Sequence, residues 1–411
     1  SGLGFLTTQN NRALEIVSNF GALNFSLAPK KELTFNGFGI VNNSQTDMFT
    51  ESKTVYNKTG LIDVSESTST QESKLALLKF STTYKPNDDL HIDYDIFGKL
   101  SNQTELVDVT STQRSADTYK KEEPISINQN FNAYYNVNEK NILAAELQYI
   151  YEKDKPLSNS LTDTQPFSFI PSVDQELYDM TQYKNFDTSK FDGKIDYYYL
   201  LNQKSNINLS FGSTLSSQNY HTSISQILDN GTEIDFNEQE LNNHVDYNFT
   251  DLFVGVYYKI VEGIFTFNPG VNLHNYQIKD EQLSMVDKES LIKILPDVYA
   301  RFQFKSSESL RFNYSISSQF SDVNDAAEGF IYSNYRAMYK GNRDLENSLN
   351  HKYSLSYFSF SMFNFTNINA SLNYTKKVNG IKNRTLLVGV DRVSSPVNSE
   401  FADETFSGNF R

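Results

Sequence analysis

The segment 88–100, DDLHIDYDIFGKL, shows most clearly the pattern that decides the fold of this chain. Its even positions from Leu90 to Leu100 are apolar or glycine, whereas its odd positions are mostly polar, with Phe97 as the exception. An alternation with a period of two predicts a β-strand that has one apolar and one polar face. The apolar face must then contact either a protein core or lipid.

Seven hairpins built on this plan follow one another along the chain. In each, a short polar turn separates two alternating strands, as KPNDD (85–89) does before the segment above. The hairpins occupy 23–41, 78–100, 125–151, 195–211, 252–267, 298–316 and 353–374, and residues 385–411 begin a further strand or hairpin. We therefore predict about 14 to 16 antiparallel strands in the chain.

The connections between hairpins are much longer than the turns within them. They include 101–124, 152–194, 216–251 and 317–352. Because short and long connections alternate, all short turns lie at one end of an antiparallel sheet and all long loops at the other. Outer-membrane barrels have this layout, with short periplasmic turns and long extracellular loops. We expect part of each long connection to be strand that continues beyond the bilayer.

The alternative to a barrel is a soluble sandwich, in which two sheets pair their apolar faces across one core. Sandwiches use connections of mixed length at both ends, and two further features favour lipid. Aromatic residues recur at strand ends, where they suit the headgroup layers: Tyr84, Tyr94, Tyr135, Tyr149, Tyr151, Tyr314, Tyr353 and Tyr374. The opposite strand face is polar, as a wide lumen allows: Asp93, Asp95, Asn132, Glu146, Gln148, Asn208, Ser210, Arg301, Gln303, Arg311 and Asn313.

The fold class that these patterns predict is all-β: a transmembrane, antiparallel, up-and-down β-barrel. In the opening segment, Leu90, Ile92, Tyr94 and Ile96 should face lipid, with Leu90 nearest the periplasmic rim. The polar side chains His91, Asp93, Asp95 and Lys99 should face the lumen. Residues 1–411 are expected to form a single outer-membrane barrel domain that is incomplete at both ends.

Composition limits the functions that the chain can have. Its 411 residues carry a net charge of −14, which argues against a duplex nucleic-acid binder. The sequence has no cysteine, which excludes disulfides, thiolate metal sites and cysteine nucleophiles. It contains no run of about 18 apolar residues, the length that a transmembrane helix needs.

No motif for a metal, cofactor or catalytic site is present in the sequence. The five histidines, His91, His221, His244, His274 and His351, have no pair at metal-ligand spacing, which favours scattered surface or lumen residues. The acidic segments 229–240 and 321–329 do not fit the calcium-loop pattern, although looser calcium binding in these loops stays open. Phosphate-loop, G-x-S-x-G and H-E-x-x-H motifs are absent. We therefore predict no catalytic, cofactor or metal residues, and no enzyme activity.

Two groups of residues allow both a functional and a structural interpretation. Asp93 and Asp95 share one strand face and could act as a catalytic pair, but solvated lumen residues are the commoner case. Aromatic residues in the 152–194 connection could either hold a sugar or peptide or pack the loop: Phe167, Phe169, Tyr178 and Tyr183. The nearest candidate for a helix is 324–339, as a short helix within a loop. Substrate-binding residues cannot be assigned from the sequence.

Three segments resemble the barrels of TonB-dependent receptors of Bacteroidota. In ILPDVYARFQFKSSESLRFNYSISSQF (294–320), a Leu-Pro leads into a strand, and the next strand ends in a Tyr-Ser-rich stretch. GNRDLENSLNHKYSLSY (341–357) is similar to the family's Gly-Asn-Pro-x-Leu-x-Pro-Glu block, although Arg343 replaces the usual proline. TDLFVGVYYKIVEGIFTFNPGVNLHNY (250–276) resembles its mid-barrel hairpin. The resemblance implies a 22-stranded barrel, whose N-terminal plug and TonB-contacting segment are not in these residues.

The resemblance implies a TonB-dependent receptor that takes up a glycan, peptide or siderophore across the bacterial outer membrane. The alternative is a structural barrel subunit of an outer-membrane machine for secretion or protein insertion. An outer-membrane hydrolase is a third possibility, which no nucleophile motif supports. The expected partners are outer-membrane lipid, lipopolysaccharide and a surface lipoprotein or other outer-membrane protein. TonB is a partner only if a plug and TonB box lie upstream, and no nucleic-acid partner is expected.

Overall fold

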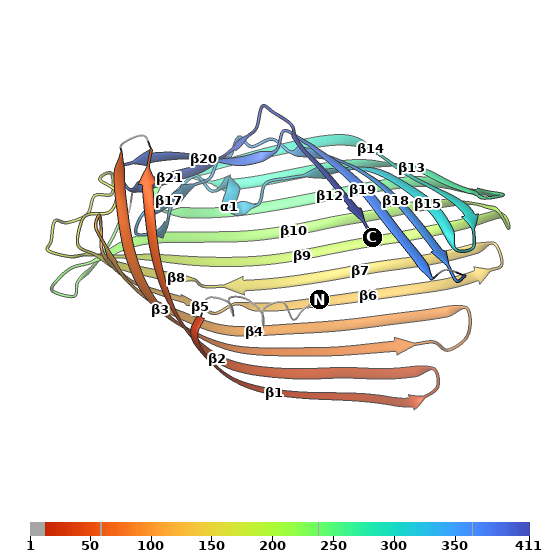
Figure 1. The fold of residues 1–411 in the computed structure, drawn as a ribbon, viewed down its shortest axis with the longest axis horizontal. Coiled ribbons are helices and arrows are strands. Elements are labelled where there is room, and N and C mark those ends of the chain that lie inside the picture. The colour runs from red at the N-terminus through yellow and green to blue at the C-terminus, as the bar shows by residue number, and fades with distance from the viewer. Residues whose placement is uncertain (1–12, 58–59, 237, 364) are drawn as a thin grey trace.

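The computed structural model describes residues 13–57, 60–236, 238–363 and 365–411. Most of them form one antiparallel sheet in which each long strand pairs with the next along the chain (Figure 1). Its long strands are β1 (Ala13–Lys30), β2 (Leu33–Tyr56), β3 (Leu61–Tyr84), β4 (Leu90–Ser111), β6 (Ile125–Asn138), β7 (Asn141–Asp154), β9 (Tyr178–Asn202), β10 (Ser205–Ile227), β12 (Asn243–Glu262), β13 (Phe265–Gln282), β14 (Met285–Lys305), β15 (Glu308–Gln319), β18 (Ser348–Ser361), β19 (Thr366–Val378) and β22 (Asp403–Phe410). The short strands β5 (Ala116–Glu122), β8 (Leu157–Thr162) and β11 (Glu233–Asp235) extend it at the long-loop end.

The seven predicted hairpins are confirmed. They are β1–β2, β3–β4, β6–β7, β9–β10, β12–β13, β14–β15 and β18–β19. Their short turns gather at one end of the sheet, on the right of Figure 1, and the long connections at the other. The sheet has 18 strands including the three short ones, so the predicted number of long strands is also confirmed. Among the described residues no pairing joins β1 to β22, and the sheet is open between them.

Much of the sequence that was predicted as loop is strand. It continues beyond the stretch of outward-facing apolar side chains on each strand, which we call the apolar band. β2 and β3 pair without interruption from Leu33 opposite Tyr84 to Tyr56 opposite Leu61. β13 and β14 are joined at Leu283 and Ser284, whose φ angles of 52° and 61° are those of a type I′ hairpin turn. The prediction that long connections contain continuing strand is therefore confirmed, and between β13 and β14 hardly any loop is left.

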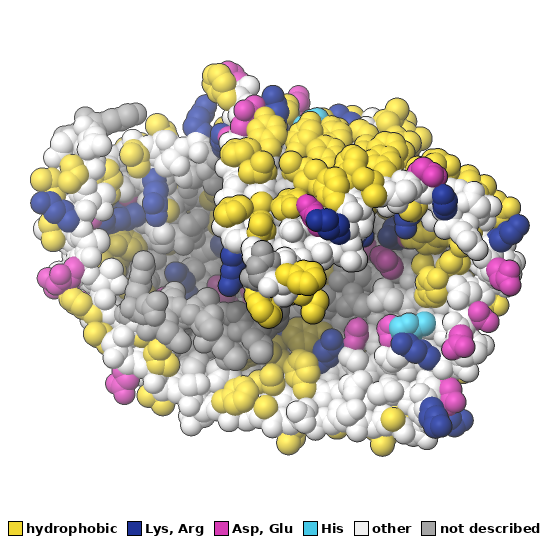
Figure 2. Space-filling view, turned by 45° about the vertical axis from the view of Figure 1, so that its right-hand side comes forward, with side chains coloured by type: hydrophobic (Ala, Val, Ile, Leu, Met, Phe, Trp, Pro, Cys, Tyr) yellow, Lys and Arg dark blue, Asp and Glu magenta, His cyan; other side chains and the backbone are white. Residues whose placement is uncertain are grey.

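The alternation along each strand sorts side chains onto two faces of the sheet. On β12, Leu252, Val254 and Val256 are each nearly half exposed on the outer face. Figure 2 shows such apolar side chains as one patch on the outside of the curved sheet, and charged side chains are visible on part of its concave side. In the opening segment, Ile96 lies opposite Phe80 of β3, and Asp93 accepts a 2.7 Å hydrogen bond from Thr83 on the other face. Ile96 and Asp93 therefore lie on opposite faces of the sheet, as the sequence predicts for the lipid-facing and lumen-facing side chains.

A second sheet of 4 strands lies at the long-loop end, and the sequence pattern did not predict it. It is formed by two distant hairpins, β16 (Phe330–Asn334) with β17 (Ala337–Lys340) and β20 (Ile381–Val388) with β21 (Asp391–Asn398). β17 and β21 pair in parallel, with Met338 opposite Val393. The short helix expected within the 324–339 segment is α1 (Val323–Ala326) at its start, and most of the remaining segment forms the β16–β17 hairpin. None of the helices in the described ranges is long and apolar enough to cross a membrane.

Candidate functional site

The small sheet and its flanking residues form a cap, which we define as residues 321–347 and 379–399. The cap packs against the inner face of the main sheet, which we call the wall. The wall residues that it covers occupy the alternate strand positions whose side chains face the lumen. Tyr220 and Ile224 of β10 and Val245 and Tyr247 of β12 are at such positions, and all four are nearly fully buried. The cap therefore lies on the inner side of the curved sheet, at the long-loop end of the strands.

Two apolar clusters hold the cap against the wall. The first combines residues from three places. Phe167 and Ile170 come from the 163–177 loop, Tyr332 and Met338 come from the cap, and the others belong to the wall and the connection between β10 and β12. The second is formed by α1 and Ile331 against β10 and β12. Their members are Phe167, Ile170, Met180, Ile224, Phe236, Leu241, Tyr332 and Met338 in the first and Tyr220, Val245, Tyr247, Val323, Ala326, Ala327 and Ile331 in the second.

Amide side chains of the wall bind the backbone of the cap. Asn243 accepts a 2.7 Å hydrogen bond from the backbone N–H of Gly329 and donates a 3.1 Å bond to its carbonyl. A Cβ at residue 329 would overlap the carbonyl oxygen of Asn242, so this contact requires glycine. Gln182, which is fully buried, accepts a 2.7 Å bond from the N–H of Tyr332. Gln218 and Gln282 bind the backbone around α1 in the same way.

Three ion pairs join the cap to the rim of the barrel, and two of them are adjacent, since Arg336 donates a 3.0 Å hydrogen bond to the carbonyl of Arg114. Arg336 of the β16–β17 turn pairs with Asp63 at the start of β3, and Arg114 between β4 and β5 pairs with Asp391 of β21. Arg343 contacts Asp280 of β13 at 2.8 Å. The side chains in these pairs are at most 17% exposed. The cap therefore connects β3 and β4 with β13, which lies several strands further along the sheet.

The Asp63 site has a perturbed carboxyl group. Burial would raise the pKa of Asp63, but hydrogen bonds from Arg336 and Ser111 and the charge of Arg336 outweigh burial, and the pKa is lowered. Arg343 occupies the position where the resembling family usually has proline, and here its guanidinium also donates to the carbonyls of Asp280 and Met285. Where proline would stiffen the loop, Arg343 instead binds the loop directly to the wall.

An aromatic cluster lies on the inner face near the cap. His274 of β13 stacks between Phe253 and Tyr276, at ring-centroid distances of 4.9 and 5.2 Å. Its Nδ1 lies 2.9 Å from the carboxylate of Asp251. Phe320, which immediately precedes the cap, contacts Tyr276 at 4.6 Å.

The residues singled out in the sequence fall into different places. Asp93 and Asp95 lie on the inner face near the short turns, where His91 and Lys79 pair with them at 2.8 and 3.6 Å. Phe97, the exception to the alternation, lines an inner hollow of 1050 Å³ together with Phe38, Ile40 and Leu77. The alternating pattern did not predict this group. A single apolar residue on the polar face of one strand does not indicate that neighbouring strands place further apolar residues beside it.

The aromatic residues of the 152–194 connection divide between the two interpretations. Phe167 is buried against Tyr332, and Tyr178 is buried with its hydroxyl bonded to Asp174, which supports loop packing for these two. Phe169 and Tyr183 are 47% and 39% exposed. The acidic segment 321–329 has a structural role at its start, where Asp322 accepts hydrogen bonds from the first N–H groups of α1.

The five histidines are not all scattered. His221 of β10 and His244 of β12 lie directly opposite each other on the outer face, with ring centroids 4.1 Å apart. Burial and the neighbouring His244 lower the pKa of His221, against the opposing effect of Asp246 and Asp187. Sequence spacing could not show this contact, because the two histidines are brought together by the register of two strands. Among the described residues, no three His, Cys, Asp or Glu side chains are grouped to hold a metal ion.

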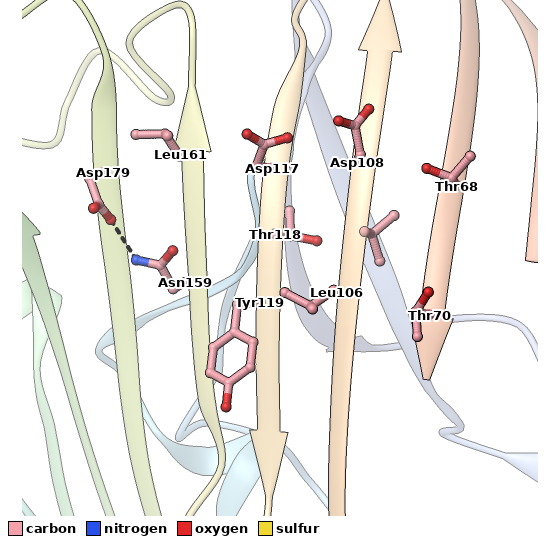
Figure 3. A pocket seen from close by; sticks show the side chains of 11 residues that line it. Thr68, Thr70, Leu106, Asp108, Asp117, Thr118, Tyr119, Asn159, Leu161 and Asp179 are labelled. Atoms are coloured by element: carbon pink, nitrogen blue, oxygen red, sulfur yellow. Dashed lines mark hydrogen bonds between the residues drawn. The ribbon is translucent and has the colours of Figure 1, made fainter. Parts of the chain in front are cut away.

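A pocket of 380 Å³ lies on the outer face of β3, β4, β5, β8 and β9 (Figure 3). Carboxylates line it together with hydroxyl and apolar groups, and Asp179 accepts a hydrogen bond from Asn159. Its labelled side chains are Thr68, Thr70, Leu106, Asp108, Asp117, Thr118, Tyr119, Asn159, Leu161 and Asp179. Because it opens away from the lumen, this pocket is not part of a path through the barrel.

The fold is similar to several solved outer-membrane transport proteins. The outer membrane transporter YddB from Escherichia coli matches with a TM-score of 0.51 and 12% identity, over 96% of this chain and 52% of that one. The copper transporter OprC matches with 0.53 and 12%, over 97% and 58%. A structure of the RagAB peptide importer matches with 0.51 and 9%, over 92% and 48%. No protein-family model and no curated protein sequence matches the chain.

These comparisons establish the architecture of the chain. It has the fold of TonB-dependent outer-membrane receptor barrels, as the sequence predicts, and its apolar outer band is the surface that such barrels present to the bilayer. The chain spans about half to three-fifths of the length of these structures. All three are transport proteins rather than enzymes by their descriptions.

Proposed function

We propose that the chain is the barrel of a TonB-dependent receptor of the type found in Bacteroidota, and that it takes up a nutrient across the outer membrane. The observation that carries the proposal is the cap, which packs against the inner face of the main sheet through buried contacts. Such a cap places loop residues directly in the path between the outside and the lumen. The nutrient class, whether glycan, peptide or siderophore, follows only from the resemblance.

The inner-face aromatic cluster is the surface we propose for contact with the nutrient. Phe253 supplies an aromatic ring at the end of the stack, and the His274–Asp251 pair adds polar groups beside it. Flat rings with a neighbouring polar group suit a sugar or a peptide. A surface lipoprotein or another outer-membrane protein would act on the outside of the cap, and TonB would be a partner only if a plug and TonB box are encoded upstream.

The test is uptake in the native bacterium. Deletion of the complete gene should abolish growth on one member of a panel of glycans, peptides and ferric siderophores, and the intact gene should restore it. Loss of TonB should reproduce the defect for the same nutrient. Growth unaffected on the whole panel, together with copurification of fixed partners, would contradict uptake and favour the structural subunit.

A substitution series then tests the role of the inner face. Phe253→Ala should raise the nutrient concentration needed for half-maximal uptake, because it removes one ring face from the cluster. Leu252→Ala on the same strand faces outward and is the matched control. Equal uptake by both variants would remove the aromatic cluster from the transport path without contradicting uptake itself.

A further inference from the structure

The outer face of β9, β10 and β12 carries a group of metal-donor side chains above the apolar band. On β10 the band ends at Leu215, and on β12 it ends at Leu252. His221 and His244 lie further along these strands toward the extracellular end, directly opposite each other in the ladder. Both are therefore outside the bilayer, and both project from the outer face of the sheet.

The two histidines belong to a larger array set by strand register. Asn185 of β9 lies opposite His221, so one row across three strands reads Asn185, His221 and His244. The next row toward the membrane contains Asp187, Asn219 and Asp246. Every side chain in the two rows therefore carries a nitrogen or oxygen atom that can bind a cation.

Two of these donor atoms, Oδ1 of Asn185 and Oδ1 of Asp187, are buried without a hydrogen bond in the described part of the chain, and only the second has an ion-pair partner, Lys153. A buried amide oxygen without a donor is costly, and a bound cation or its water would satisfy it. This oxygen lies on the strand position next to His221, on the same face as the two imidazoles.

We propose that His221 and His244 bind one divalent transition-metal ion at the extracellular rim, with the Asn185 amide oxygen and water completing its coordination. Two imidazoles select borderline ions such as Zn²⁺, Ni²⁺ and Cu²⁺ over Mg²⁺ and Ca²⁺, which prefer oxygen ligands. The carboxylates of Asp187 and Asp246 make the surroundings negative, although Asp187 also pairs with Lys153 at 3.1 Å. The bound ion would join β10 to β12 on the side of the wall opposite the cap.

The test uses the full-length protein purified in detergent with a histidine-free tag and stripped of metal with a chelator. Addition of Cu²⁺ should give one saturable site whose electron paramagnetic resonance spectrum shows two nitrogen donors. Calorimetry with Zn²⁺ should give the same stoichiometry. By the order of divalent-ion affinities, Cu²⁺ should bind more tightly than Ni²⁺ or Zn²⁺.

His221→Gln and His244→Gln should each weaken binding by about tenfold or more and remove one nitrogen from the Cu²⁺ spectrum. His91→Gln, which removes one histidine elsewhere, is the matched control and should bind as the wild type does. Without metal, thermal unfolding of the three variants should match the wild type, and Zn²⁺ should raise the unfolding temperature only where both histidines remain. Asn185→Ala should weaken binding less than either histidine variant.

Three outcomes would overturn the proposal. The first is the absence of saturable binding in the wild-type protein. The second is binding that neither His221→Gln nor His244→Gln weakens. The third is a loss of affinity in His91→Gln equal to that in the two site variants, which would show nonspecific binding to any histidine.

Discussion

The apolar band of the main sheet and the cap that packs against the inner face of that sheet are stabilised in opposite ways. The band exposes its apolar side chains outward, as at Val254 and Ile294, and its strands pair with their neighbours in sequence. The cap buries its apolar side chains against segments far away in the chain, as where Tyr332 and Met338 share a cluster with Phe167. The comparison shows that lipid selects a periodic surface, whereas a cap on the inner face of the sheet needs buried polar anchors with individual partners.

The largest effect is expected where the cap loses a buried ion pair. Arg336→Met leaves the Asp63 carboxylate, whose side chain is 3% exposed, without its partner. Removing one member of a buried pair costs about 3–5 kcal/mol. Hydrogen exchange measured by mass spectrometry should rise across 323–345 while the strands of the band stay protected.

The matched control for this change is Lys382→Ala, which removes an ion pair with Asp403 whose side chains are 48% and 44% exposed. An exposed pair contributes about 0–1 kcal/mol, so exchange in the cap should hardly change. Similar exchange in both variants would mean that the ion pairs of the cap are not what holds it to the rim.

The next largest effect is expected in the band. Ile96→Arg places a charge on the lipid-facing side of β4, near the middle of its apolar stretch, and should cost about 2–4 kcal/mol. Unfolding by guanidinium in lipid vesicles measures the loss. Asp95→Asn, on the lumen-facing side, removes only a 3.6 Å pairing with Lys79 and should unfold almost as the wild type does. Equal losses in the two variants would contradict the assignment of the faces.

A smaller effect is expected from the amide contacts. Gln182→Leu leaves the backbone N–H of Tyr332 and the carbonyl of Ser223 without the partners they have in the protein. Unsatisfied buried groups of this kind cost about 1–3 kcal/mol. The change should appear as faster proteolysis of the β16–β17 hairpin. Gln148→Ala, which loses a 3.2 Å bond to Asn128 on the wall away from the cap, should leave that rate unaltered.

Acid should release the cap at Asp63 before it affects the band. Because the pKa of this carboxyl is lowered in the folded protein, its ion pair contributes stability above the ordinary aspartate pKa and loses it as the pH falls through the lowered value. Pepsin cleavage within 323–345 should therefore increase between about pH 4 and pH 2. In Asp63→Asn the increase should be weaker, and an unchanged acid response in that variant would assign the effect to other groups.

The hairpins and their order were readable from the sequence because a lipid-facing strand repeats one rule every two residues. DDLHIDYDIFGKL gave the faces of Ile96 and Asp93 without any knowledge of their neighbours. The candidate site was much harder to predict from the sequence. Phe167 was left open between a ligand contact and loop packing, and only its burial against Tyr332 favours packing.

The sequence by itself determined the strand periodicity, the alternation of short and long connections and the absence of cysteine chemistry. The tertiary structure alone decided the cap, the Arg336–Asp63 pair and the contact of His221 with His244. The physical reason is the range of the interactions. Alternation and turn chemistry act between residues close in the chain, whereas the ion pair joins residues 273 positions apart and the histidine contact depends on the register of two strands.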